Sequence, residues 1–140
     1  MNGTRQAGFS LIELLLVVVI IGIVAMLAVP ALQKGIRAAE NGNAFATMRS
    51  IATTQVGFYS QNTRFGRLAE INNVLSQSLG TVSGNSLTRG KFTFDMAPAA
   101  PSDTELKAGY TITATRNVSG EGVVYKYQIS QSGEITQILP

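Results

Sequence analysis

The chain has 140 residues, a formal net charge of +3, and neither cysteine nor histidine. A chain of this length accommodates one small domain beside a short additional segment. The composition excludes disulfide bonds, zinc sites built from cysteine and histidine, and nucleophilic sites that depend on a histidine base.

An apolar stretch close to the N-terminus is the most informative part of the chain. The sixteen residues 14–29 carry no polar side chain, and the 21 residues 9–29 are interrupted only by Ser10 and Glu13. At ~1.5 Å of rise per helical residue this run spans about 31 Å, close to the ~30 Å hydrocarbon core of a bilayer. The sequence therefore predicts a membrane-spanning helix behind a short leader.

A secretory signal peptide is an alternative interpretation of this stretch. Such a peptide has about 7 to 15 apolar residues followed by a cleavage site with small residues. The run here is longer, and a cut at its far end would fall near residues 28–31. The junction between Gly8 and Phe9, ahead of the run, is the better candidate for cleavage.

Glu13 does not fit a simple membrane anchor. A carboxylate that faces lipid costs on the order of 2.5 to 3.5 kcal/mol on insertion scales. Its partner is either internal, since positions 9 and 13 share one face of a helix, or in a second molecule. A position at the membrane interface is a further alternative, and the sequence alone leaves these choices open.

The order of these residues resembles the N-terminus of type IV prepilins and of type II secretion pseudopilins. The hexapeptide GFSLIE at positions 8–13 carries the resemblance, with the apolar run that follows it and contains Gly22 and Pro30. The resemblance implies that a prepilin peptidase cuts after Gly8 and methylates the amine of Phe9. It also implies that the carboxylate of Glu13 pairs with the Phe9 amine of a neighbouring subunit during filament assembly.

The resemblance implies three segments: a cleaved leader (1–8), a membrane and filament-core helix (9–30), and an amphipathic helix with a C-terminal antiparallel-sheet head (31–140). Its implied partners are copies of the chain and other pilins, the prepilin peptidase, an inner-membrane assembly platform, and the bilayer before assembly. The precursor would cross the inner membrane once with its head outside the cytoplasm, and the assembled pilus would be extracellular. Adhesion, motility or DNA uptake are the implied uses, with no cofactor, metal or enzymatic activity.

The helix is expected to continue beyond Pro30. Proline removes one backbone donor and clashes with the preceding turn, so a kink or local melting is expected near residues 22–30 and not a stop. Apolar residues at spacings of three and four then predict an amphipathic helix to about residue 60. This stripe comprises Leu32, Ile36, Ala39, Phe45, Met48, Ala52, Val56 and Tyr59, widened by Ile51 and Phe58.

The last third of the chain predicts strands. Apolar and polar residues alternate in the segments 91–96, 110–116, 123–129 and 134–139, with turn residues between the last three. Such alternation indicates antiparallel hairpins, so we expect an α+β head with a four-stranded sheet under the amphipathic helix. Residues 61–90 predict a surface loop with one or two helical turns at 68–75, and residues 97–103 predict an exposed connection.

The charged residues of the head distinguish poorly between function classes. The eleven basic residues are scattered singly, so a DNA-binding face is weakly supported; its candidates are Arg89, Lys91, Arg116 and Lys126. The C-terminal region has no acidic loop with calcium-binding spacing. Major type II pseudopilins typically have one, which favours a pilus subunit over a pseudopilin. A bitopic membrane protein with a ligand-binding head is the remote alternative.

Overall fold

The computed structural model describes residues 8–118, 120 and 124–140. The chain divides into two compact units, Met1–Ala39 and Glu40–Pro140. The predicted leader up to residue 7 and the predicted start of a strand at Val123 lie outside the described residues.

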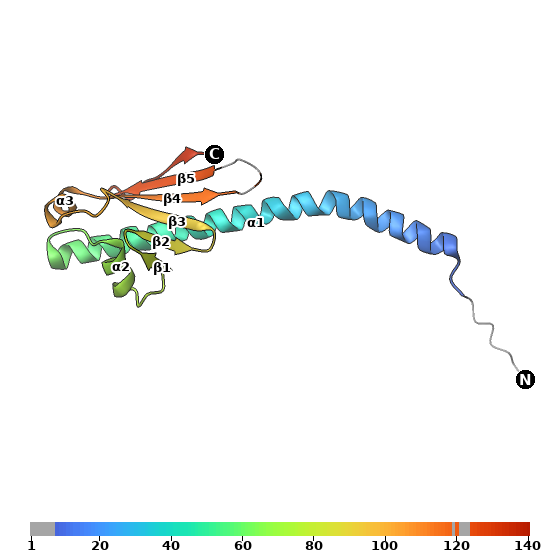
Figure 1. Cartoon of the computed structure of the whole chain (residues 1–140), viewed down its shortest axis with the longest axis horizontal. Helices are drawn as coiled ribbons and strands as arrows, with labels where there is room; N and C mark the ends of the chain where they lie inside the picture. The colour runs from blue at the N-terminus through green and yellow to red at the C-terminus, as the bar shows by residue number, and fades with distance from the viewer. Residues whose placement is uncertain (1–7, 119, 121–123) are drawn as a thin grey trace, which may run out of the picture. The chain divides into compact units, whose positions relative to one another are not determined.

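One long helix, α1, runs from Leu11 to Asn62 (Figure 1). It contains Pro30 and continues beyond it, which confirms that this proline does not stop the helix. Helix is retained through Gly22 as well, so the backbone does not unwind in this region. A bend at these two residues stays a prediction.

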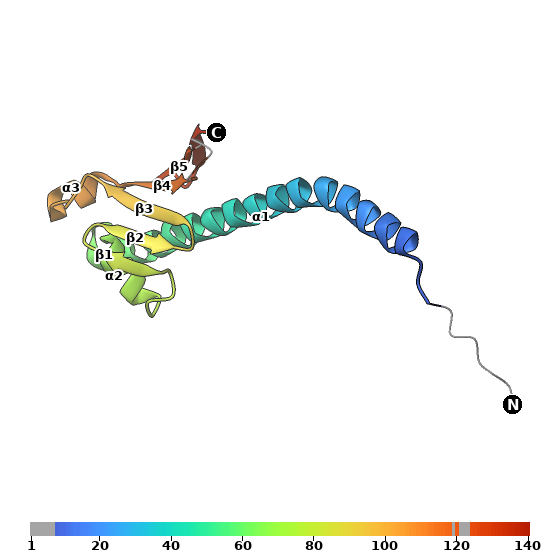
Figure 2. The same ribbon diagram turned by 45° about the vertical axis from the view of Figure 1, so that its right-hand side comes forward.

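The second unit contains a six-stranded sheet in which every strand pairs antiparallel with the next one along the chain. Figure 2 shows β2 to β5 as successive neighbours. The strands are β1 (Thr81–Ser83), β2 (Ser86–Arg89), β3 (Phe92–Ala97), β4 (Thr111–Asn117), β5 (Val124–Ser130) and β6 (Ile135–Leu139). The predicted α+β class is confirmed, but the predicted number of four strands is wrong.

The two strands that the sequence did not predict form the β1–β2 hairpin inside residues 61–90. Its two-residue loop places Gly84 at φ +61°, a backbone conformation that glycine adopts without steric strain. Only Leu87 of this hairpin is buried, and Val82 is half-buried. The hairpin therefore lacks the apolar alternation by which the other strands were predicted.

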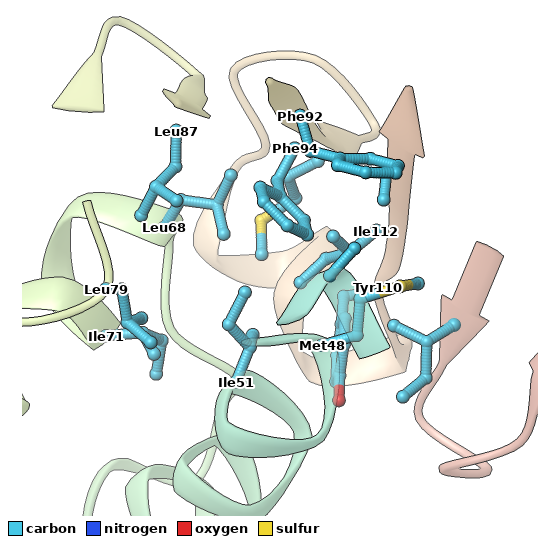
Figure 3. Packing of buried hydrophobic residues seen from close by; sticks show 14 of the residues in the cluster. Met48, Ile51, Leu68, Ile71, Leu79, Leu87, Phe92, Phe94, Tyr110 and Ile112 are labelled. Carbon is cyan, nitrogen blue, oxygen red and sulfur yellow. The ribbon is translucent and has the colours of Figure 1, made fainter. Parts of the chain in front are cut away.

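The core of the second unit lies between the sheet and the C-terminal half of α1. On the inner face of β3, Phe92, Phe94 and Met96 are buried, as their alternation predicted. Figure 3 shows Met48 and Ile51 of α1 pointing towards these strands, and neither is exposed. Burying one such side chain contributes roughly 1.5 to 3 kcal/mol, so these contacts hold helix and sheet together.

The predicted apolar stripe of α1 is only partly correct. Met48 and Ile51 are buried, but Val56 is 67% exposed and Tyr59 is 40% exposed. Gln55, a polar residue, is fully buried instead. The buried face is thus rotated relative to the prediction, because it includes a glutamine that the apolar pattern could not count.

Two short helices flank the sheet. The turns predicted at 68–75 are present as α2 (Leu68–Val74), whose Leu68 and Ile71 join the core. The other helix, α3 (Asp103–Ala108), begins where an exposed connection was predicted. Ser102 and Glu105 cap its first turn reciprocally, so the helix forms directly after the prolines.

Gln55 joins α1 to the segment that follows it. Its side-chain nitrogen donates to the carbonyl oxygen of Gly66 at 2.7 Å, and its oxygen accepts from the Gly66 N–H at 2.7 Å. Both backbone groups are buried, so they have no access to water. The glutamine side chain thus satisfies one donor and one acceptor that would otherwise be lost.

We predict that Gln55→Met destabilises the second unit by about 2 kcal/mol, because it leaves both Gly66 backbone groups buried and unpaired. The measurement is urea unfolding of the full chain in a mild detergent, followed by near-ultraviolet circular dichroism. Gln61→Met, at an exposed position of the same helix, is the matched control and should change the stability by less than about 0.5 kcal/mol. Equal effects of the two substitutions would contradict the proposed role of Gln55.

Arginine and carboxylate side chains join α2 to the start of α3. Arg64 donates to both carboxylate oxygens of Glu70, at 2.7 and 2.9 Å. Arg67 donates to Asp103 at 2.8 Å and to the carbonyl oxygen of Pro101 at 2.9 Å. The hydrogen bonds from Arg64 lower the pKa of Glu70 to about 2.

A pH-dependent stability difference follows for Glu70→Gln. The pKa of Glu70 is lower in the folded chain than in the unfolded chain. Its contribution to the free energy of unfolding is therefore complete above the unfolded pKa and decreases as the pH falls towards about 2. The wild type should exceed the variant by roughly 1 kcal/mol at neutral pH, and the difference should vanish in strong acid. Urea unfolding at several pH values measures it. The control is Glu134→Gln, which changes an exposed carboxylate that has no ion pair to any described residue. A difference that does not depend on pH would exclude the ion pair as its cause.

Candidate processing and assembly site

Gly8 and Phe9 lie directly before α1. Phe9 is 81% exposed. A Cβ atom added at Gly8 would meet no atom within 4 Å. Within the described part of the chain, no contact therefore requires glycine at this position, and a requirement for glycine would have to come from another molecule.

Glu13 occupies the third position of α1. Its Oε2 atom accepts a hydrogen bond from the backbone N–H of Ser10 at 2.9 Å, and Leu14 N–H donates to the Ser10 carbonyl oxygen at 3.2 Å. The carboxylate thus satisfies one of the free N–H groups at the helix start, where negative charge is favourable. The group that the carboxylate contacts is neutral. No ion pair to Glu13 is present among the described residues.

The surface of α1 that follows Glu13 is apolar all round. None of its most apolar 18 residues is buried, and the helix is long and apolar enough to cross a membrane. Exposed side chains include Leu14, Ile21 and Leu27, and exposed apolar residues continue to Ile36. A helix that is apolar on every side needs an apolar environment, either lipid or protein.

Gly22 lies within this surface, and a Cβ atom added there would also meet no atom within 4 Å. Pro30 lacks the N–H group that would bond the carbonyl oxygen four residues earlier. Neither residue contributes to packing within the described part of its own chain, so their roles in a helix bend stay predictions.

An ion-pair cluster lies at the first residue of the second unit. Glu40 forms ion pairs with Arg116, whose Nη2 atom lies 2.6 Å from Oε2, and with Lys91, whose Nζ atom lies 3.4 Å from Oε1. Arg116 is only 5% exposed and lies over the ring of Tyr125, with 6.0 Å to its centroid. Its Nε and Nη1 atoms have no hydrogen-bond partner. Glu40 is therefore the only charge partner of a buried guanidinium in the described part of the chain.

The predicted DNA-binding residues do not form one basic surface. Arg116 is buried on the inner face of β4, whereas Lys126 lies on β5 opposite Thr115, on the outer face. Arg89 and Lys91 are exposed on either side of the β2–β3 turn. The prediction that included Arg116 as a surface residue is thus wrong, because that strand position faces the helix.

Comparisons with known proteins cover only part of the chain. The family model described as "Prokaryotic N-terminal methylation motif" matches residues 3–29. Over 65 residues the chain is 37% identical to the type IV major pilin protein PilA of Myxococcus xanthus (strain DK1622), a match that covers 46% of this chain and 30% of that protein. No solved structure matches the chain. These findings confirm the resemblance to the type IV pilin and pseudopilin family that was predicted from Gly8 to Glu13.

We predict that Glu40→Gln destabilises the second unit by about 3 kcal/mol, because it leaves the Arg116 guanidinium buried without a counter-charge. The same substitution in an Arg116→Met background should cost less than about 1 kcal/mol. Urea unfolding of the two single variants and the double variant gives the coupling energy. Lys91→Gln removes only the exposed partner and should change the stability by less than about 1 kcal/mol. Equal costs of Glu40→Gln in both backgrounds would show that the two side chains are not coupled.

Proposed function

We propose that the chain is a structural subunit of a type IV pilus, cut after Gly8 and polymerised through its N-terminal helix. One observation carries the proposal: Glu13, which has no charge partner among the described residues, directly precedes the exposed apolar part of α1. The matched methylation motif and the similarity to a major pilin support it.

The apolar surface of α1 explains storage in a membrane before assembly. Residues 9–29 cover the hydrocarbon thickness of a bilayer, so lipid satisfies this surface while the subunit is a monomer. In a filament, the same surface packs against the helices of neighbouring subunits. One set of side chains thus serves in both environments, with the head outside the cytoplasm.

Glu13 explains why the subunit leaves the bilayer for a filament. Its hydrogen bond to Ser10 provides no positive charge, so the carboxylate is costly in an apolar environment. Cleavage after Gly8 creates a free amine on Phe9, which is equally costly there. An ammonium and a carboxylate from different subunits lower both costs when they meet. The reaction that creates the amine therefore also prepares the subunit for assembly.

A type II secretion pseudopilin would use the same N-terminal chemistry. Two observations favour the pilus: the C-terminal region has no acidic loop with calcium-binding spacing, and the similar curated protein is a type IV major pilin. The filament of a pseudopilin stays within the cell envelope, so the location of the mature chain separates the two functions.

The first test is mass spectrometry of protein sheared from the outside of the native cells. We expect an abundant chain that begins at N-methylated Phe9. The same mature chain confined to the cell envelope would establish the pseudopilin instead. A chain that still begins at Met1 would contradict both functions.

The second test separates cleavage from assembly. Gly8→Ala should leave uncut precursor in the membrane. Glu13→Val should be cut normally, yet its amount in the sheared fraction should fall roughly 100-fold, since the lost pairing is of the order of 3 kcal/mol.

Glu13→Gln is the matched variant for Glu13→Val. Its amide oxygen still accepts from the Ser10 N–H, so the start of the helix stays capped while the charge is lost. We expect the same assembly defect as for Glu13→Val. Wild-type amounts of Glu13→Gln in the sheared filaments would show that capping and not charge pairing is the role of this residue.

A further inference from the structure

The sheet ends in two edge strands, β1 and β6, and neither pairs with a further strand within the described part of the chain. Edge strands of native sheets are usually protected by charged side chains, by proline or by a covering segment. Neither strand contains a charged residue or a proline, and Ile138 and Leu139 of β6 are 44% and 42% exposed. Both edges are therefore suited to pairing with another strand.

The free edge of β1 offers one pair of backbone groups. A two-residue loop joins β1 to β2, so Ser83 and Ser86 on either side of it exchange both of their backbone hydrogen bonds. Such pairs alternate with pairs that exchange none, and Val82 opposite Leu87 is of the second kind. The N–H and C=O groups of Val82 consequently point away from β2, towards the free edge.

A cavity of about 600 Å³ lies beside this edge, between α2 and β1. Val82 lines it from β1, Asn73 from α2 and Gln77 from the connection between them, and none of the described residues that line it is charged. Ser76 and Gln77 have φ angles of +54° and +61°, and the Gln77 N–H donates to the Asn72 carbonyl oxygen at 2.7 Å. Such strained residues persist only where the surrounding structure holds them. The cavity therefore has a fixed wall, with neutral amide groups and room for a side chain of an added strand.

The other edge strand, β6, matches this edge in length and chemistry. A bulge interrupts its pairing with β5 after Gln137, so the part in continuous register is Ile135–Gln137, three residues as in β1. Gln137 lies opposite the buried Tyr127 and hence on the inner face of the sheet, the face on which Val82 lines the cavity. Its amide can exchange hydrogen bonds with the amides of Asn73 and Gln77.

The number of strands decides how two copies fit together. Neighbouring strands are all antiparallel and there are six of them, so β1 and β6 run in opposite directions. Two heads in the same orientation, side by side, thus place β6 of one antiparallel to β1 of the other. Because the two edges lie on opposite sides of the sheet, this contact is heterologous and can repeat without closing, as a filament requires.

We propose that β6 of one subunit pairs with β1 of the next, so that the sheets of neighbouring heads continue one another in the filament. The backbone groups of Val82 supply the hydrogen bonds and the cavity receives Gln137 of the added strand, as in other cases of strand addition to a sheet edge. The inference rests on the proposed function, since a filament holds its subunits in one orientation.

The first test is cross-linking in sheared filaments, which is specific because the chain has no cysteine of its own. Thr81 and Thr136 are exposed on the outer face of the two edge strands. We expect a short bismaleimide to convert the double variant Thr81→Cys with Thr136→Cys into dimers, trimers and larger multimers. Each single variant should stay monomeric. The control pair, Thr104→Cys with Thr136→Cys, uses an exposed threonine of α3 and should also stay monomeric.

The second test removes one backbone donor. Proline is tolerated on an edge strand where the N–H group points away from the sheet, so Val82→Pro should leave the midpoint of urea unfolding unchanged. In the background of the two edge cysteines it should lower the yield of multimers roughly fivefold, which corresponds to one hydrogen bond. Val82→Ile keeps the N–H group and should leave this yield unchanged.

Mature filaments in which the two edge cysteines give only monomers would overturn the inference and leave the proposed function intact. Dimers of Thr136→Cys alone would show pairing of β6 with β6, and multimers of the Thr104 control pair would show contact without specificity; either result overturns the inference. Unchanged multimers of Val82→Pro would exclude backbone pairing at β1. Absence of the mature wild-type chain from the sheared fraction would overturn the proposed function, and the inference with it.

Discussion

Glu13 carries a negative charge at the start of a helix surface that is apolar and exposed from Leu14 to Val29. Lipid satisfies the apolar side chains but not the charge, and the Ser10 N–H offers only a neutral partner. An environment that satisfies both the apolar side chains and the charge must provide apolar groups along the helix and one positive charge at its start. Copies of the same helix, each with the free amine that the proposed cleavage creates at Phe9, have this composition. The proposed cleavage, membrane storage and assembly thus share one physical cause, a carboxylate in an apolar surface.

Polar side chains join helices of the head to the segments that follow them. Gln55 binds the backbone of Gly66, and Asn72 accepts from Leu79 N–H and donates to the Gly80 carbonyl oxygen. Each contact satisfies buried backbone groups and also fixes a loop next to the helix that carries the side chain. Such hydrogen bonds contribute to the stability of the fold mainly when their partners are shielded from water. Loss of one of these side chains therefore leaves buried donors or acceptors unpaired.

The sequence predicted those features that leave a local pattern. The apolar run and the alternation on β3 to β5 depend on residues close together in the chain, and the structure has a helix and strands at these places. Ser102 and Glu105 are also a local capping signal for α3, although the sequence analysis predicted only an exposed connection at residues 97–103. The pairs Gln55 with Gly66 and Glu40 with Arg116 had no such signal, because nothing in the chain marks residues 11 or 76 positions apart as partners. For this reason Arg116 was wrongly predicted to lie on a DNA-binding surface. Its alternation with threonines does not reveal the carboxylate on the facing helix.

The first part of α1 is an exposed apolar segment and the later part belongs to the core of the head, which bears on the proposed function. In the described part of the chain, the buried residues begin at Ala44, so residues 8–43 contribute none of the core of the head. Glu40 forms its ion pair with Arg116 within the head. Neither the core nor this ion pair includes a residue from 9–36. The head can consequently keep its structure during the proposed passage of the N-terminal segment from a membrane to a filament.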